Sequence, residues 1–216
     1  MSAPLRGLFV SGTGTGVGKT FVTCALARSL VDAGLRTIAL KPVETGVADI
    51  PEDAVALAAA CGVPVLAYAE GFHRVAPALS PYAAGLEGAP IPPAPKALAE
   101  TIRGLAKVHR AAVTLVEGAG GLLVPLDGAH TMADLAEALD VPVLLVALDA
   151  LGTLSHTLTA FESAQRRGLR VLAVYLSHPP AVPPDGTAGT NARILRERLD
   201  VPVIDSVAAL HGLICP

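Results

Sequence analysis

Short apolar runs rich in valine, isoleucine and leucine alternate along the chain with longer segments in which alanine and leucine recur among polar residues. Apolar runs of about four to eight residues are typical of buried strands, whereas longer periodic segments are typical of helices. Strands are predicted over residues 5–11, 36–41, 111–118, 141–148, 169–177 and 201–207. Because these runs are continuously apolar, the pattern indicates a parallel sheet that is covered on both faces.

The segments between the strands carry signals of helix ends. Pro51 is expected in a first helical turn with Glu52 and Asp53 behind it, where proline and acidic residues are favoured. Thr131 is expected to be an N-cap, with Asp134 completing a near capping box. Val-Pro-Val follows three of the helix ends, and proline there stops a helix and favours an extended chain. Helices are predicted over residues 19–34, 51–61, 95–109, 131–140, 153–167 and 190–199.

This alternation predicts an α/β fold in which a doubly wound, mainly parallel sheet carries helices on both faces. Residues 63–95 are rich in proline and glycine, and the pattern assigns no element to them. Residues 178–190 have a similar composition but lie between a predicted strand and a predicted helix, so we expect a surface loop there. No interdomain linker is recognisable, and residues 1–216 are predicted to form a single domain.

Composition narrows the class of protein. Of the 216 residues, 52% are hydrophobic and 16% are charged, which excludes a strongly solvated, disordered chain. Aromatic residues make up only 3%, so alanine, valine and leucine must fill the core. The net charge of −3 provides no basic surface for nucleic acid or for an anionic membrane.

Cysteine usage and apolar length indicate the compartment. Cys24, Cys61 and Cys215 are odd in number, widely spaced and without metal-type spacing, so we expect reduced thiols and no disulfides. The first ten residues have no apolar segment typical of a signal peptide. No apolar run approaches the roughly 18 residues that a membrane span needs. We therefore expect a cytoplasmic protein that does not associate with membranes.

The sequence GTGTGVGKT at residues 12–20 joins the first predicted strand to the first predicted helix. A strand that leads through glycines into a helix directs backbone N–H groups and the helix N-terminus at one point, which favours phosphate. The spacing is one residue longer than the usual Walker A pattern, because Thr13 stands where the first glycine is expected. Lys19 can reach the β- and γ-phosphates of a nucleotide, and Thr20 can offer its hydroxyl to Mg²⁺.

Two further motifs follow predicted strands. KPVETG places Lys41 at the end of the second strand and continues as a loop, and EGAGG places Glu117 at the end of the strand over 111–118, before a glycine-rich turn. Ligands of open α/β sheets bind at the carboxyl ends of the strands, so both side chains should face the glycine loop. There a lysine can stabilise developing phosphoryl or carboxyl charge, and a carboxylate can contact Mg²⁺.

Together TGTGVGKT, KPVETG and EGAGG resemble the dethiobiotin synthetase family in order and separation, and the longer loop spacing is itself a trait of that family. Weaker similarity extends over most of the chain, through EDAVAL, SPYAAGLEG and LGTLSHT. The resemblance implies a P-loop NTPase fold and an ATP- and Mg²⁺-dependent ring closure. A 7,8-diaminononanoate amine takes up CO₂ as a carbamate, ATP phosphorylates the carbamate, and the neighbouring amine closes the ureido ring of dethiobiotin.

The resemblance also implies roles for individual residues. Lys19 and Lys41 match the positive charges required where carbamate and phosphate meet. Thr20, Asp53 and Glu117 match the Mg²⁺ ligands, and family members are homodimers with the active site at the subunit interface. The positions that match substrate contacts are Thr15, Thr45, Gly152 and Thr153. Those that match nucleotide contacts are Thr15, Gly16, Val17, Gly18, Lys19, Thr20, Phe21, Asp53, Glu117, Gly118, Ala119, Gly120 and His178.

The sequence departs from the family pattern at three places. Gly16 stands where some members have glutamate. The loop before the second helix is short, so Asp49 competes with Asp53 for the metal role, and the local match of EDAVAL favours Asp53. His178 stands where an adenine-reading asparagine is frequent, so selectivity for the base is open.

Two other classes of protein share parts of this pattern. A cobyrinate synthase of the amidotransferase type would need a further glutaminase domain, for which 216 residues leave no room. A MinD/ParA-like ATPase switch is the alternative from a different class. That group carries an additional lysine early in its loop, which Thr13 to Val17 lack, and often an amphipathic tail, for which AALHGLICP is too short.

Overall fold

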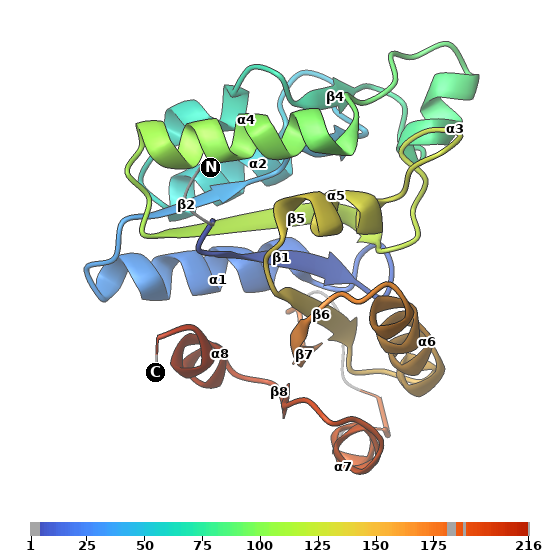
Figure 1. Ribbon diagram of the computed structural model, residues 1–216. Coiled ribbons are helices and arrows are strands. Elements are labelled where there is room, and N and C mark those ends of the chain that lie inside the picture. Colours follow the sequence, from blue (N-terminus) through green and yellow to red (C-terminus); the bar gives the residue numbers. More distant parts are fainter. Residues whose placement is uncertain (1–4, 181–184, 188, 216) are drawn as a thin grey trace.

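A six-stranded, fully parallel sheet forms the centre of the molecule (Figure 1). The computed structural model describes residues 5–180, 185–187 and 189–215. The strand order is β2-β5-β1-β6-β7-β8. The strands are β1 (Gly7–Gly12), β2 (Thr37–Leu40), β5 (Val113–Gly121), β6 (Val143–Leu148), β7 (Val171–Ser177) and β8 (Val203–Ile204). The chain leaves β1 toward β2 and leaves β6 toward β7, in opposite directions, which opens a crevice at the carboxyl ends of the strands.

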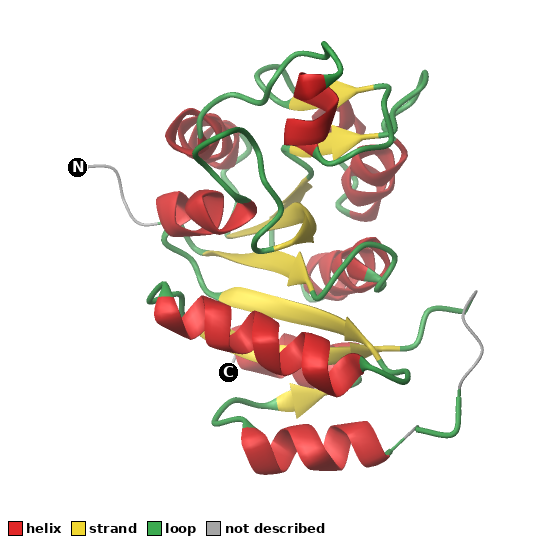
Figure 2. Cartoon of the chain, turned by 90° about the vertical axis from the view of Figure 1, so that its right-hand side faces the viewer, coloured by secondary structure: helices red, strands yellow, loops and turns green. Residues whose placement is uncertain are grey.

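Helices cover both faces of this sheet, as Figure 2 shows from the side. They are α1 (Lys19–Asp32), α2 (Glu52–Ala60), α3 (Pro81–Leu86), α4 (Pro95–Val108), α5 (Met132–Leu139), α6 (Thr153–Arg166), α7 (Thr190–Arg198) and α8 (Val207–Ile214), with a 3₁₀ helix, η1 (Pro64–Tyr68). The predicted doubly wound α/β architecture is therefore confirmed, and most predicted element ends lie within two residues of the observed ones.

Successive strand residues point to opposite faces, and this alternation builds two hydrophobic clusters. On β1, Leu8 and Val10 pack with α1 and with Leu210 of α8. Phe9, between them, packs into the second cluster with α4, α5, α6 and α7. All of these side chains are fully buried, as the continuous apolar pattern predicts.

The predicted start of the helix over residues 131–140 is correct. Thr131 is the N-cap of α5, and its backbone N–H donates to Asp134 Oδ2 at 2.6 Å. Arg167, which follows α6, contacts Asp134 Oδ1 at 3.3 Å and Glu137 Oε1 at 2.9 Å. The capping carboxylate therefore also connects α5 to the end of α6.

Three predictions about local structure are wrong. The predicted loop in KPVETG contains strand β3 (Val43–Thr45), which pairs in parallel with β4 (His73–Val75) as a separate small sheet. The predicted glycine-rich turn after Glu117 is strand, because β5 continues to Gly121 alongside β1. Neither strand β3 nor the additional residues of β5 could be predicted from the side-chain pattern, since both depend on pairing with segments that are distant in sequence.

The third error lies near the C-terminus. The strand predicted over 201–207 is only β8, and Val207 begins helix α8. The Ser206 hydroxyl accepts from the Ala209 N–H at 3.4 Å and caps this helix. His211 holds α8 against α1 through a 2.7 Å hydrogen bond between its Nδ1 and Ser29 Oγ. Of the loop predicted over 178–190, residues 181–184 and 188 lie outside the described residues.

No helix within the described part of the chain is long and apolar enough to cross a membrane.

Candidate active site

The glycine loop lies at the carboxyl end of β1 and leads into α1, the geometry expected of a phosphate-binding loop. Gly18 is the N-cap of α1 and has a left-handed conformation, with φ of 92°. A Cβ on Gly18 would lie 2.2 Å from Ser177 Oγ at the end of β7, and side chains rarely adopt this backbone conformation, so glycine is favoured here. Lys19 Nζ donates to the carbonyl oxygen of Gly14 at 2.9 Å and closes the loop on itself.

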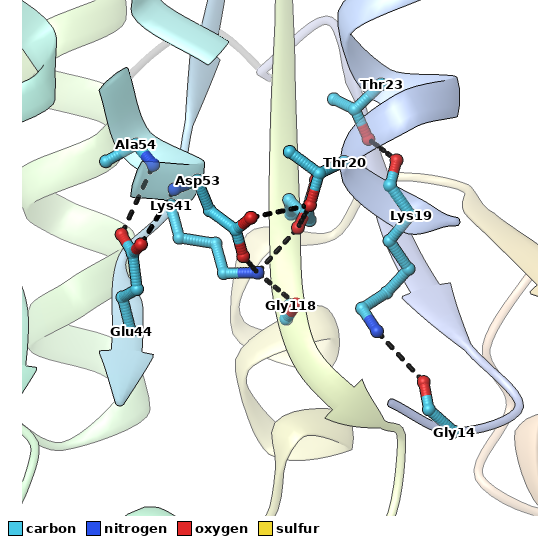
Figure 3. A network of polar contacts seen from close by, with 10 residues as sticks. Gly14, Lys19, Thr20, Thr23, Lys41, Glu44, Asp53, Ala54 and Gly118 are labelled. Atoms are coloured by element: carbon cyan, nitrogen blue, oxygen red, sulfur yellow. Dashed lines mark hydrogen bonds and ion pairs between the residues drawn. The ribbon is translucent and has the colours of Figure 1, made fainter. Parts of the chain in front are cut away.

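Four side chains from four segments converge beside this loop. Thr20 Oγ1 lies 2.9 Å from Asp53 Oδ1 and 2.9 Å from Glu117 Oε1. Lys41 Nζ lies 2.9 Å from Asp53 Oδ2 and 2.5 Å from Glu117 Oε1. Figure 3 shows Thr20, Lys41 and Asp53 facing one another between α1, β2 and α2. Segments separated by up to 97 positions in the chain thus form one polar cluster.

Burial and neighbouring charges shift the pKa values of Lys41 and Asp53 in opposite directions. Glu117 has no exposed surface and Lys41 is 5% exposed. Burial by itself lowers the pKa of Lys41, but the carboxylates of Glu117 and Asp53 outweigh it and hold that pKa above its ordinary value. Partial burial raises the pKa of Asp53, but the charge of Lys41 outweighs it and lowers that pKa. Lys41 and Asp53 therefore each stabilise the charged form of the other at neutral pH.

Lys19 differs from Lys41 in its surroundings. Burial, together with the positive charge of Lys41, lowers the pKa of Lys19 to about 8, although Glu117 and Asp53 act in the opposite sense. The burial of Lys19 thus disfavours its charged form, and a negative group beside it would offset that cost. A phosphate bound at the loop would supply that group.

The donor atoms of the cluster fit Mg²⁺. The Thr20 hydroxyl has a single hydrogen, so it can donate to only one of the two carboxylate oxygens beside it. Glu117 Oε2 is buried and has no hydrogen-bond partner among the residues that the structure describes. In the described residues, no group of three or more His, Cys, Asp or Glu side chains could hold a metal alone. Mg²⁺ commonly takes one or two carboxylates and completes its shell with phosphate oxygens and water, so these oxygens suit it.

A cavity of about 400 Å³ opens over this cluster. Most residues that the sequence predicted for the site line it, namely Thr15, Gly16, Gly18, Lys19, Thr20, Phe21, Lys41, Thr45, Asp53, Glu117, Ala119 and Gly120. Of the two candidate aspartates, the structure brings Asp53 to the cluster and leaves Asp49 exposed.

The remaining predicted residues lie away from the cavity lining. Val17, within the loop, has a buried side chain, and Gly118 accepts from Lys41 through its carbonyl oxygen at 3.3 Å. Gly152 and Thr153 begin α6, at the end of a different strand. His178 follows β7, is half exposed, and lies 3.6 Å from Asp149 Oδ2.

Two lining residues, Val43 and Glu44, were not singled out from the sequence. Glu44 is buried, and burial raises the pKa of its carboxyl despite hydrogen bonds from the backbone of Asp53 and Ala54. Its position beside Lys41 in KPVETG was the available signal, but a glutamate in an assumed loop is usually solvated.

The fold and the phosphate loop define a P-loop nucleotide-binding protein. A family model described as an AAA domain matches residues 6–215. The septum site-determining protein MinD from Pyrococcus horikoshii, solved with Mg-ADP, is 20% identical, with 97% of this chain and 85% of that chain covered and a TM-score of 0.53. At that identity the likeness to MinD is one of fold alone.

Relatives with higher sequence identity indicate a particular family. The ATP-dependent dethiobiotin synthetase BioD of Anaeromyxobacter sp. (strain K) is 46% identical over 187 residues, covering 83% of this chain and 82% of the relative. BioD of Geobacillus sp. (strain WCH70) is 35% identical over 213 residues, covering 95% and 85%. The chain belongs to the ATP-dependent dethiobiotin synthetase family, and it is accordingly a ligase that uses ATP.

Proposed function

We propose that this protein converts 7,8-diaminononanoate, CO₂ and ATP into dethiobiotin, ADP and phosphate in a Mg²⁺-dependent reaction. An amine of the substrate and CO₂ form a carbamate. The carbamate oxygen attacks the γ-phosphorus of ATP, ADP leaves, and a carbamic–phosphoric anhydride results. The second amine then attacks the anhydride carbon, the ureido ring closes, and phosphate departs. The observation that carries this proposal is the position of Lys41 beside a phosphate loop and two buried or half-buried carboxylates in one cavity.

The two lysines have different tasks in this proposal. Lys19, in the loop, neutralises the phosphate oxygens of the nucleotide. Lys41, at the end of β2, stabilises the charge that develops where the carbamate oxygen meets the phosphorus. Its permanent positive charge supports this role, because the neighbouring carboxylates raise its pKa. A charge held in a buried site requires no reorganisation during the reaction.

Thr20, Asp53 and Glu117 would hold the Mg²⁺ ion. When bound, the ion would neutralise charge on the phosphate groups of ATP. Two observations support this assignment: Glu117 Oε2 has no hydrogen-bond partner among the described residues, and the Thr20 hydroxyl can donate to only one of the two carboxylate oxygens beside it.

Thr15 and Thr45 line the same cavity and are proposed to contact the diamine or its carbamate. Gly152 and Thr153 are also proposed substrate contacts, although they do not line this cavity. We propose that a second copy of the chain brings them to it, in a homodimer with the site at the subunit interface. Such an interface would also exclude water from the hydrolysable anhydride.

The proposal is tested by incubating the purified protein with 7,8-diaminononanoate, bicarbonate and MgATP. Dethiobiotin, ADP and phosphate should form in equal amounts, and omission of the diamine or of bicarbonate should stop ADP release. ATP hydrolysis that is independent of both, or that requires a membrane or a protein partner, would instead favour the MinD/ParA-like switch. Light scattering on the active sample separates a dimer from a species of 21.8 kDa.

A further inference from the structure

Helix α2, which carries Asp53, begins without a capping side chain of its own. Its N-cap is Pro51, which has no side-chain acceptor. The first backbone N–H groups of any helix lack partners within the helix. An N-cap side chain normally accepts from the N–H of the second or third helical residue. In α2 these residues are Asp53 and Ala54, whose amides therefore need an acceptor from another part of the chain.

Glu44 on β3 supplies both acceptors. Its Oε1 accepts from the Asp53 N–H at 2.8 Å and its Oε2 accepts from the Ala54 N–H at 3.2 Å (Figure 3). The carboxylate is buried against the positive end of the α2 dipole, which favours an anion there. The cross-strand neighbour of Glu44 on β4 is Arg74, which adds positive charge nearby.

Asp53 is consequently held from two directions by one short segment. Lys41 contacts its carboxylate, and Glu44, three residues further on, binds its backbone N–H. The Asp53 side chain is 40% exposed, so packing alone does not immobilise it. The backbone at the start of α2 is what aims this carboxylate at Thr20 and Lys41.

We propose that Glu44 is a positioning residue that fixes the first turn of α2 and thereby keeps Asp53 in place for Mg²⁺. The inference rests on the proposed function, which assigns the ion to Thr20, Asp53 and Glu117. Both oxygens of Glu44 accept from the backbone amides of Asp53 and Ala54, so we assign its action to the first turn of α2 and not to the ion itself. Groups that support metal ligands in this way typically account for about 10–100-fold in metal affinity.

The test measures ADP binding by isothermal titration calorimetry, once with Mg²⁺ and once with EDTA. In Glu44→Ala the gain in ADP affinity produced by Mg²⁺ should fall about tenfold, with binding in EDTA unchanged. Glu44→Gln should show a smaller loss, because its amide oxygen still accepts from one N–H. Glu52→Ala is the matched control. It removes the same charge from an exposed side chain at the start of the same helix and should leave both affinities unchanged.

An unchanged Mg²⁺ effect in Glu44→Ala, or an equal loss of binding in EDTA, would overturn the inference. If Glu44→Ala does not fold, Glu44→Gln must still show a selective loss with Mg²⁺, and its absence is equally decisive. Asp53→Asn, with the exposed Asp49→Asn as control, tests the underlying metal assignment. If Asp53→Asn weakens the Mg²⁺ effect and neither Glu44 variant does, only the inference fails.

The Asp53→Asn variant also tests the metal assignment in the opposite direction. If Asp53→Asn leaves the Mg²⁺ effect intact, the metal assignment is wrong and the inference falls with it. If Glu44 acts through Asp53, Glu44→Ala should add little to the loss already present in Asp53→Asn, because the effects of two substitutions that act through the same residue are not additive. Full additivity of the two losses would show that Glu44 acts by another route.

Discussion

Replacing Lys41 with glutamine removes an ammonium group from between two carboxylates. Glu117 is completely buried, and of the two contacts that its Oε1 makes with described residues, loss of Lys41 would leave the one with the Thr20 hydroxyl at 2.9 Å. Removing one partner of a buried ion pair typically costs about 3–5 kcal/mol. Since Asp53 is 40% exposed and admits water to the site, we expect the lower end, about 3 kcal/mol. For a chain of this size that is a fall in Tm of roughly 6–12 °C.

The same change should affect catalysis more than nucleotide binding. One preorganised charge at a developing anion is worth roughly 10²–10³ in rate, so ring closure in Lys41→Gln should fall at least a hundredfold. Nucleotide binding through the glycine loop and Lys19 should largely persist. Because Mg²⁺ can replace the missing positive charge, Mg²⁺ with ADP should raise the Tm of the variant more than that of the unchanged protein.

Scanning calorimetry in EDTA and in MgADP, together with the rate of dethiobiotin formation, measures these effects. Lys96→Gln, at an exposed position on α4, is the matched control for loss of a lysine charge. Near-normal turnover in Lys41→Gln would remove Lys41 from the mechanism. An unchanged Tm in EDTA would refute the electrostatic reasoning for the cluster, even if turnover were lost.

Two further predictions concern the base of the nucleotide and the pH dependence of stability. If His178 faces the base, its rigid ring cannot reproduce the planar pairing of an asparagine amide, so kcat/KM for ATP, GTP and CTP should agree within about tenfold to a hundredfold. A preference for ATP above about a thousandfold that survives His178→Ala would show that the base is read elsewhere. Partial burial raises the pKa of Asp134, but hydrogen bonds from Thr131 and the charge of Arg167 outweigh it and lower that pKa. This stabilisation is present above the unfolded pKa of about 3.9 and is lost as pH falls through the lower folded value. In chemical denaturation, Asp134→Asn should cost about 1 kcal/mol at pH 7 and progressively less at pH values below about 4, and a constant difference across pH would contradict the assignment.

The sequence by itself determined the main sheet, its covering helices and much of the site. Short, continuously apolar runs are typical of strands buried on both faces, so their alternation with helices implied the parallel sheet. Because the carboxyl ends of parallel strands meet at one edge, Lys41 and Glu117 could be assigned to the glycine loop before their contacts were known. These inferences depend on local periodicity and on a general rule of topology. That the whole chain is one domain stays a prediction.

Tertiary structure alone decided the short elements around the cluster and the contacts that hold it in place. Strands as short as β3 and β4 have no periodicity to detect and exist because they pair with each other. No element was predicted over most of helix α8, which begins at the last residue of the predicted strand because Ser206 caps it and α1 offers a surface for Leu210. The contact of Glu44 with the start of α2, and with it the place of Asp53 in the cluster, depends on where β3 lies. A buried carboxylate needs partners, and sequence alone does not show which distant amides will supply them.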